Sequence, residues 1–399
     1  MFTDLQTERF ADVLIWALKT ARTGKFKKRD LIYLQYDPAA VKLAEILYDR
    51  ILSMGMHCVQ RMGLTVSMEK SFYAQSDDAQ LTFIAPGDRE LIGRINGRIF
   101  LRAPDSLTHL KDADPGKIGK TLVSRKPLRE IMDKREDEGV YSWTLTSLPT
   151  AELARQAKLS LPKYTEQVVK ACYLDEENPV ACWQAIYTEV KGIKKWLDSY
   201  DVRSFHVESK HCDLVITPGE KRKWVGVSGH NMPSFEIFTS PDWRGTAGSY
   251  YADFPSFRSG NYVKGVRLVF KKGQAVAIDA ETGGEFTKQQ LAMDQGACRI
   301  GEFSLTDKRF SRIDRFMADT LFDENHGGKF GNCHIAVGAS YSTAYDGDPK
   351  TLTKAAKKKL GFNDSALHWD LVNTEDKTVT AHLAGGKKVI IYDNGQFKY

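Results

Sequence analysis

The first hundred residues alternate between strand-like and helix-like apolar patterns, and this alternation constrains the fold more than any other feature of the chain. Residues 30–36 (DLIYLQY) and 98–101 are rich in strand-forming residues, and residues 56–62 form a weaker strand candidate. Residues 38–54 open with a proline at the first-turn position and have helical spacing, and residues 88–95 are also helical. Repeated strand–helix–strand units pair in parallel, so this region predicts a small α/β domain.

The pattern changes near residues 103–115, a polar segment that contains two prolines. Four helical segments follow, at residues 118–136, 149–159, 163–173 and 180–200. From residue 204 onward, β-branched and aromatic residues alternate with polar ones, as in residues 212–217, 224–227, 263–270 and 276–279. A length of 399 residues favours two domains. We therefore expect an α/β domain over residues 1–108, followed by a larger α+β domain with a mixed sheet over residues 109–399.

Charge and cysteine content narrow the expected partners and location. There are 57 Lys+Arg against 51 Asp+Glu, which gives a net charge of +6, and the basic runs at residues 25–29, 191–195 and 354–359 are short and belong to no recognisable nucleic-acid-binding motif. We therefore expect no nucleic-acid partner. No apolar stretch is long enough to span a membrane, and the acidic start (Asp4, Glu8, Asp12) is unlike a signal peptide. Six scattered cysteines without a CxxC pair fit reduced thiols, so we expect a cytoplasmic protein without membrane partners.

Several familiar motifs are absent or incomplete. Gly119-Lys120-Thr121 resembles part of a phosphate loop, but Asp114 occupies the position of the required first glycine, where it would repel phosphate. The chain contains no GxGxxG, HExxH or GxSxG pattern. His206 and His211 lie five residues apart, a spacing that does not fall on one helix face, so we expect structural roles for them.

A histidine and an acid lie two residues apart near the C-terminus, at His368 and Asp370. If this segment is a strand, both side chains project from the same face. An imidazole beside a carboxylate is the minimum of a mixed nitrogen–oxygen site for zinc, cobalt or manganese. Taken alone, the spacing also fits a solvated or internally hydrogen-bonded pair.

Three further residues of these types stand in apolar stretches: Glu236, Glu302 and His334. Burying either glutamate unpaired would cost several kcal/mol, so each requires a cation or a hydrogen-bond network. With His368 and Asp370 they make three carboxylates and two imidazoles. This set suits a pair of divalent ions that share a bridging carboxylate and a water.

These motifs together resemble the M29 metallo-aminopeptidases of the thermophilic aminopeptidase type. The resemblance covers residues 230–371 and rests on five segments in order: Pro233-Ser-Phe-Glu236-Ile-Phe-Thr-Ser-Pro241, Gly301-Glu302, Leu321-Phe-Asp-Glu-Asn325, His334-Ile-Ala-x-Gly-x-x-Tyr341 and His368-x-Asp370. It implies an α/β domain followed by a catalytic α+β domain, removal of the N-terminal residue from short peptides, two divalent ions (Zn, Co, Mn or Mg) and a homodimer.

The resemblance also implies roles for individual residues. The metal ligands fall on Glu236, Glu302, His334, His368 and Asp370. Tyr341 falls on a tyrosine near the metals, where it is expected to stabilise the oxyanion. Glu236 is preferred as the bridging acid, and Glu302 is a candidate general base if it is not fully committed to metal.

Some features of the chain leave alternatives open. Residues 326–333 are more Gly-rich than the simplest family pattern and suggest a flexible loop, although His326 is an alternative ligand or substrate contact. Phe235 precedes Glu236, where a polar residue is common, and Asp323 and Glu324 fit either catalysis or bracing of the loop. Two other functions also remain open: a dinuclear hydrolase acting on amide or phosphoester substrates, and a metal-binding homologue without turnover.

Overall fold

The computed structural model describes residues 2–399 and divides them into two compact units. The first unit comprises residues 1–186, 227–234 and 317–321, and the second comprises residues 187–226, 235–316 and 322–399. Helix α9 (Pro179–Asp198) spans the point at which the chain passes from the first unit to the second. Among the described residues, no helix is both long and apolar enough to cross a bilayer.

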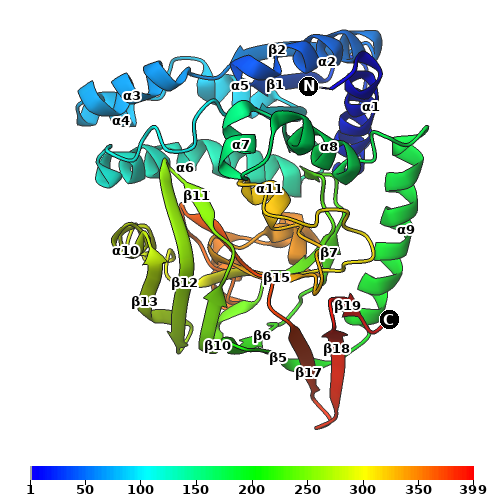
Figure 1. Ribbon diagram of the computed structural model, residues 1–399, viewed down its shortest axis with the longest axis vertical. Helices are drawn as coiled ribbons and strands as arrows, with labels where there is room; N and C mark the ends of the chain where they lie inside the picture. Colours follow the sequence, from blue (N-terminus) through cyan, green and yellow to red (C-terminus); the bar gives the residue numbers. More distant parts are fainter. Residues whose placement is uncertain (1) are drawn as a thin grey trace. The chain divides into compact units, whose positions relative to one another are not determined.

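A five-stranded parallel sheet, in the order β2-β1-β3-β4-β8, organises the first unit (Figure 1). Its strands are β1 (Leu31–Tyr36), β2 (His57–Met62), β3 (Gly97–Arg102), β4 (Ser142–Ser147) and β8 (Asn231–Met232). Helix α1 (Asp4–Thr20) packs against β3 and β4, and α2 (Val41–Ser53) packs against β1 and β2. Tyr33 of β1 instead packs with Ile92, Ile95 and Tyr141 in a separate core cluster. Both faces of β1 are therefore covered, as expected for a parallel sheet with crossover helices.

The remaining helices of the first unit are short apart from one. They are α3 (Val66–Gln75), α4 (Asp78–Thr82), α5 (Asp88–Arg94), the 23-residue α6 (Pro115–Asp137), α7 (Ala151–Gln156) and α8 (Leu161–Ala171). The expected strands and helices of residues 30–101 are all present. The expected boundary at residue 108 falls between β3 and β4, which are neighbours in one sheet, so the first compact unit continues to residue 186.

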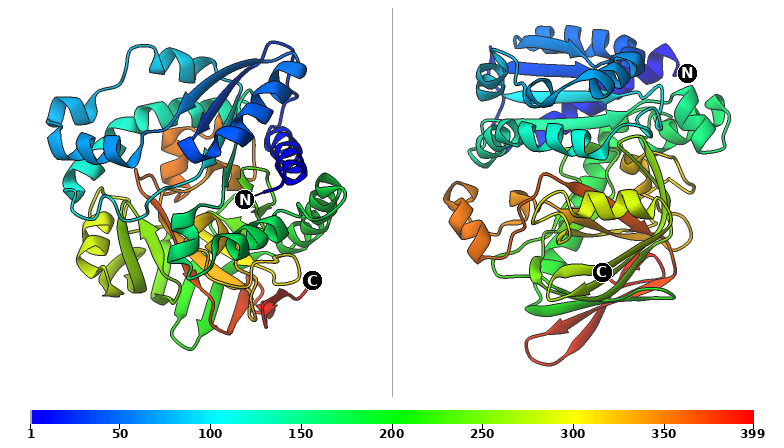
Figure 2. Two further views of the ribbon diagram at one scale, coloured as in Figure 1. Left: turned by 45° about the horizontal axis from the view of Figure 1, so that its top comes forward. Right: turned by 90° about the vertical axis from the view of Figure 1, so that its left-hand side faces the viewer.

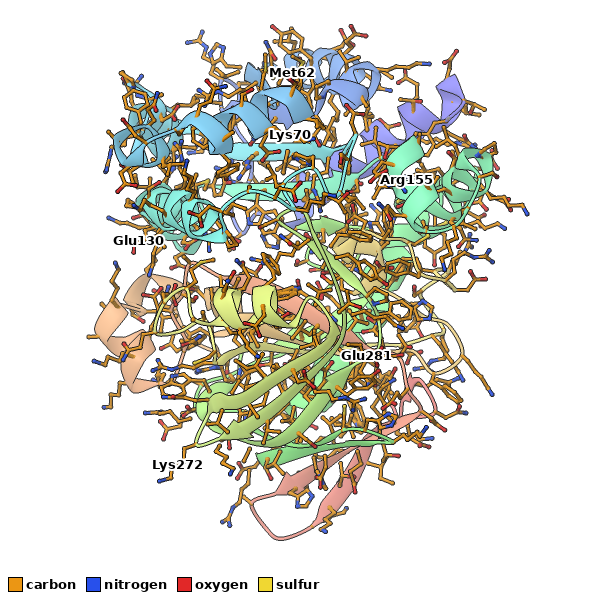
Figure 3. All side chains as sticks on the ribbon, turned by 60° about the vertical axis from the view of Figure 1, so that its left-hand side comes forward. Met62, Lys70, Glu130, Arg155, Lys272 and Glu281 are labelled. Carbon is orange, nitrogen blue, oxygen red and sulfur yellow. The ribbon has the colours of Figure 1, made fainter. Side chains whose placement is uncertain are left out.

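Two antiparallel sheets make up most of the second unit (Figures 1 and 2). The larger has nine strands and comprises β5 (Val202–Ser209), β6 (Asp213–Thr217), β10 (Asp242–Ala252), β11 (Ser256–Arg258), β12 (Asn261–Lys271), β13 (Gln274–Thr282), β17 (Lys377–Leu383), β18 (Lys388–Asp393) and β19 (Gln396–Phe397). Helix α10 (Gly284–Leu291) packs against β12 and β13. Lys272 and Glu281, labelled in Figure 3, mark the β12–β13 turn and the far part of β13.

The smaller sheet has the order β16-β15-β14-β9-β7 and carries the candidate residues. Its strands are β7 (Val225–Gly226), β9 (Glu236–Thr239), β14 (Ile300–Thr306), β15 (Asn332–Gly338) and β16 (His368–Asn373). All residues of β9, β14 and β15 are buried. The short helices α11 (Thr320–Asp323) and α12 (Lys354–Lys359) lie in the connections between strands. The mixed α/β and α+β fold class predicted from sequence is confirmed.

Candidate metal centre

Strand register brings the five predicted ligands to one face of the smaller sheet. In an antiparallel sheet, directly opposite residues share a face, as do alternate residues along a strand. Asp370 lies opposite Ala336, and Ala336 lies opposite Glu302. His368 lies two residues before Asp370 on β16, and His334 lies two residues before Ala336 on β15, so both share this face. Glu236 lies opposite Thr306, which is four residues after Glu302 on β14 and therefore also on this face. Residues scattered over 135 positions of sequence are thus gathered by pairing alone.

Ala336 lies at the middle of this face, between the carboxylates of Glu302 and Asp370 on the two neighbouring strands. A methyl group is therefore the largest group that β15 places between these two acids. Both Ala336 and the adjacent His334 are fully buried. This arrangement allows oxygens from two different strands to converge on one cation.

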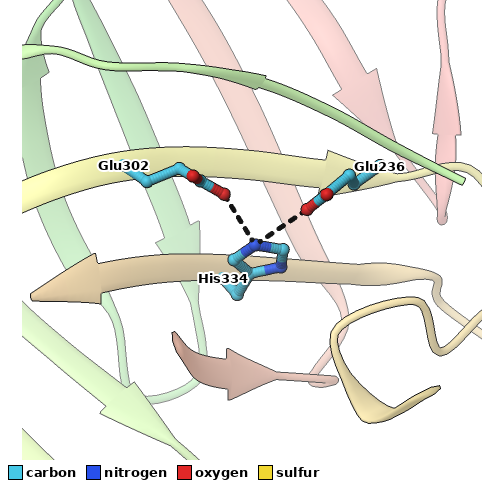
Figure 4. Close-up of side chains that lie close together, drawn as sticks. All are labelled: Glu236, Glu302 and His334. Atoms are coloured by element: carbon cyan, nitrogen blue, oxygen red, sulfur yellow. Dashed lines mark hydrogen bonds and ion pairs between the residues drawn. The ribbon is translucent and has the colours of Figure 1, made fainter. Parts of the chain in front are cut away.

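The side chains form a continuous series of contacts between acids and imidazoles. His334 Nε2 lies 3.3 Å from Glu236 Oε2 and 3.2 Å from Glu302 Oε1 (Figure 4). His368 Nε2 lies 3.8 Å from Glu302 Oε2 and 3.4 Å from Asp370 Oδ1. Glu302 therefore contacts both imidazoles with its two oxygens. One ligand atom from each of Glu236, Glu302 and His334 lies within 4.8 Å of the others.

Glu324 adds a fourth carboxylate, one that the sequence left open between catalysis and bracing of the loop. The residue is 5 % exposed, and its carboxyl interacts electrostatically with Glu236, Asp370 and Glu302. Burial, reinforced by these negative charges, raises the pKa of Glu324 well above its usual value. Glu324 follows the four-residue α11 rather than standing in a strand, so no periodicity in the sequence indicated where its side chain points. Its signal in the sequence was its place in Leu321-Phe-Asp-Glu-Asn325, one of the segments that carry the family resemblance.

The pKa shifts show how strongly the buried charges interact. Burial raises the pKa of Glu302 to about 7, against the hydrogen bond from His334. Burial alone would lower the pKa of His334, but hydrogen bonds to Glu236 and Glu302 outweigh it and raise the pKa well above its usual value. Burial also opposes ionisation of Asp370, yet His368 lowers its pKa to about 2.

Hydrogen bonds outside the cluster orient both imidazoles. His368 Nδ1 donates to the carbonyl of Ala339 over 2.9 Å, which leaves Nε2 facing the acids. His334 Nδ1 faces Asn332 Oδ1 at 3.5 Å. The amide of Asn332 in turn donates to the carbonyls of Glu324 and His326, at 2.9 and 2.8 Å. The strand that carries His334 and the segment that carries Glu324 are thereby fastened together. Partners of this kind fix the ring orientation of metal-binding histidines.

Tyr341 lies at the exposed side of this cluster. Its ring centroid is 4.7 Å from that of His368 and 6.0 Å from that of Phe238. The residue is 36 % exposed, in contrast to the buried acids, and its backbone N–H donates to Ser240 Oγ over 2.9 Å. Burial of the hydroxyl and the nearby charge of Glu302 raise the pKa of Tyr341 well above its usual value, so the hydroxyl stays protonated and can donate.

The Gly-rich segment after Asn325 is packed rather than open. His326 is 7 % exposed, and its ring lies 4.7 Å from that of Phe254. Burial lowers the pKa of His326 to about 4. Gly331 adopts a φ of +56°, and a Cβ there would lie 2.4 Å from the carbonyl oxygen of Thr306. Glycine is needed at this position because of both the backbone conformation and the close approach.

The histidines expected to be structural have other partners. His206 Nε2 lies 2.7 Å from Asp213 Oδ1, and His211 Nδ1 pairs with Glu375. These pairs involve none of the five predicted ligands.

The donor set fits a divalent cation. Three buried carboxylates and the half-buried Asp370 face two imidazoles, so even two protonated imidazoles leave an excess of negative charge when the acids are ionised. Burying unbalanced charge is costly, and a divalent ion would compensate it. Ser304, opposite His334 on the same face, also has a buried hydroxyl without a hydrogen-bond partner among the described residues.

The protein stripped of divalent ions is expected to lose stability as the pH rises from about 5 to 8. The pKa of Glu302 is about 7 in the folded protein against 4.5 for the free side chain, so its contribution is full below pH 4.5 and is lost as the pH passes 7. The raised pKa of His334 acts in the same direction. A loss on the order of 3 kcal/mol lowers the Tm by roughly 5–10 °C. Calorimetry with and without added metal checks this, and a metal-free Tm that rises between pH 5 and 8 would contradict it.

The chain is similar in sequence to known metallopeptidases over most of its length. The family model described as "Thermophilic metalloprotease (M29)" matches residues 3–397. Aminopeptidase AmpS of Bacillus subtilis is 28 % identical over 279 residues, which cover 65 % of this chain and 66 % of that protein. Aminopeptidase T of Thermus thermophilus is 27 % identical over 310 residues, which cover 72 % and 73 %.

The fold also matches a solved structure along nearly its full length. Wild-type AmpT from Thermus thermophilus superimposes with a TM-score of 0.77 and covers 98 % of this chain and 99 % of that one. At 21 % sequence identity, this match shows a shared fold.

Proposed function

Because the chain belongs to the M29 family of thermophilic metalloproteases, we infer that it is a metal-dependent aminopeptidase that removes the N-terminal residue from peptides. The observation that carries this conclusion is the largely buried series of three carboxylates and two imidazoles on one sheet face, with spacings of 3.2–3.8 Å. Carboxylate and imidazole donors together suit zinc, cobalt and manganese.

We propose that two divalent ions occupy this centre, with Zn, Co, Mn or Mg as candidates. Five donor residues exceed the protein ligands that one catalytic zinc ordinarily takes. Glu302 has one oxygen near each imidazole, which supports it as the carboxylate shared by the two ions. Glu236 contacts His334 at one end of the series, so the geometry favours Glu302 over Glu236 for the bridging role.

The chain's own residues suit the hydrolysis of a peptide bond. Bound divalent ions would supply an activated water near neutral pH and polarise the scissile carbonyl. Glu302 and Glu324 are the carboxyls whose pKa burial raises, which makes them candidates for carrying a proton at neutral pH. The protonated hydroxyl of Tyr341, beside His368, is placed to donate to the oxyanion.

Removal and return of metal test this function. Treatment with EDTA should abolish hydrolysis of Leu- and Ala-anilides and dipeptides, and readdition of Zn²⁺, Co²⁺ or Mn²⁺ should restore it. A panel that includes phosphoesters and non-peptide amides provides the comparison. Activity indifferent to EDTA, or faster turnover of phosphoesters than of aminoacyl anilides, would refute the proposal.

We also propose short peptides as substrates, a homodimer as the assembly and the cytoplasm as the location. An exposed edge strand supports pairing with a second copy, because β2 leaves Val59 and Met62 37 % and 52 % exposed. All six cysteines are free in the described chain, which supports a reducing compartment. Light scattering that gives the mass of one 45.0 kDa chain would reject the dimer, and recovery outside the cytoplasmic fraction would reject the location.

A further inference from the structure

The short strand β11 contacts the strand that carries His368 and Asp370. Trp369 Nε1 donates to Ser256 Oγ over 3.0 Å. Arg258 Nη1 donates to the backbone carbonyl of His368 over 2.9 Å, and its guanidinium lies 5.4 Å from the centroid of the Trp369 ring. The two ends of β11 therefore hold two consecutive residues of β16.

Local structure fixes the position of Arg258. The next two residues, Ser259 and Gly260, have φ values of +46° and +80°, which are typical of a tight two-residue turn between β11 and β12. Arg258 Nε also faces Oε1 of the buried Gln290 of α10 at 3.5 Å. A guanidinium with a planar set of donors is well suited to holding several groups at once.

Arg258 fixes the backbone at one metal-binding candidate of β16. His368 is held at its ring by the carbonyl of Ala339 and at its own carbonyl by Arg258, so its backbone and its imidazole are both fixed. The hydrogen bond and the contact of Arg258 with the Trp369 ring therefore preserve the donor geometry of His368 through the backbone of β16.

We propose that Arg258 is a positioning residue of the metal centre, which fixes the backbone of β16 at His368 by hydrogen bonding. This inference rests on the proposed function, because it assumes that His368 and Asp370 bind metal. Loss of such an outer partner typically weakens metal binding or activity about 10–100-fold. A residue that served folding alone, or that bound only the substrate, would leave the affinity for metal unchanged.

Metal binding without substrate tests the proposal. Arg258→Met keeps the length of the side chain but removes its charge and donors, and it should weaken Co²⁺ binding by about 10–100-fold and alter the visible Co²⁺ spectrum. Arg267→Met is the matched control, because Arg267 lies on neighbouring β12 and packs over Tyr251, 4.2 Å from its ring centroid. The control should bind Co²⁺ like the wild type. Circular dichroism and thermal melts establish that each variant is folded.

The outcomes distinguish positioning of the metal centre from a role in folding alone and from substrate binding. Wild-type Co²⁺ affinity and spectrum in folded Arg258→Met overturn the proposal, whether or not KM for peptides rises. If that variant does not fold, Arg258→Leu decides, because it also lacks every donor: weakened Co²⁺ binding by the folded variant supports the proposal and wild-type binding overturns it. A wild-type protein that binds Co²⁺ but hydrolyses no peptide would refute the proposed function and still allow Arg258 to be tested.

Discussion

Replacing His334 by alanine is expected to abolish metal binding and peptide hydrolysis together. His334 is fully buried and is the only imidazole in contact with Glu236 among the described ion pairs. Its loss removes a nitrogen donor, leaves the buried Glu236 without its imidazole and leaves Glu302 with His368 alone, a change that strongly disfavours a compact site. We expect turnover to fall by at least ~10³-fold, because without metal neither the activated water nor the polarised carbonyl is available. Metal content by mass spectrometry and kcat on an aminoacyl anilide measure the two effects.

His206→Ala is the matched control for this variant. His206 lies in the same unit, but it pairs with Asp213 and its side chain is 24 % exposed. Its replacement should leave both metal content and kcat at wild-type levels. His334→Gln, which retains a polar group of similar size, distinguishes loss of ligation from loss of folding. Full metal content in a folded His334 variant would remove this residue from the ligand set.

The local elements of the first unit could be predicted because each has its own apolar periodicity and its own boundary residues. The strand at β1 and the helix after Asp37-Pro38 follow directly from such signals. The full extent of the sheet could not be predicted in the same way. Strand β4 has the same six-residue length as β1 but is rich in Ser and Thr, and β8 consists of only two residues, Asn231 and Met232, so neither has a clear apolar pattern of its own. Pairing across the sequence, rather than local propensity, defines that sheet.

The candidate site was likewise predictable only in part. His368 and Asp370 could be assigned to one face from strand alternation, whereas Glu236, Glu302 and His334 were linked to them by the family resemblance. The register then brings Glu302 and Asp370 to either side of Ala336. Glu324 and Arg258 could not be assigned in this way. Glu324 lies in a connection after α11, and Arg258 reaches β16 from a strand of a different sheet. Their roles depend on tertiary contacts that no spacing in the sequence encodes.

Tyr341→Phe is expected to lower kcat by ~10²–10³-fold while sparing the metal content. The substitution removes only a hydroxyl that stays protonated, because burial and the charge of Glu302 raise its pKa. The ring remains free to pack against His368 and Phe238, so the site should keep its shape. A donor that acts on the oxyanion is needed in the transition state more than in the ground state, and the effect should therefore fall on kcat rather than on KM.

Tyr262→Phe provides the control, because Tyr262 has almost the same exposure, 37 % against 36 %, and its ring packs against Phe257 instead of the metal-site residues. It should leave kcat unchanged, so that a general effect of losing a phenolic hydroxyl is excluded. If Tyr341→Phe empties the site of metal, the tyrosine is a ligand or a structural brace. If it changes neither kcat nor metal content, Tyr341 plays no part in catalysis, and oxyanion stabilisation must come from other groups.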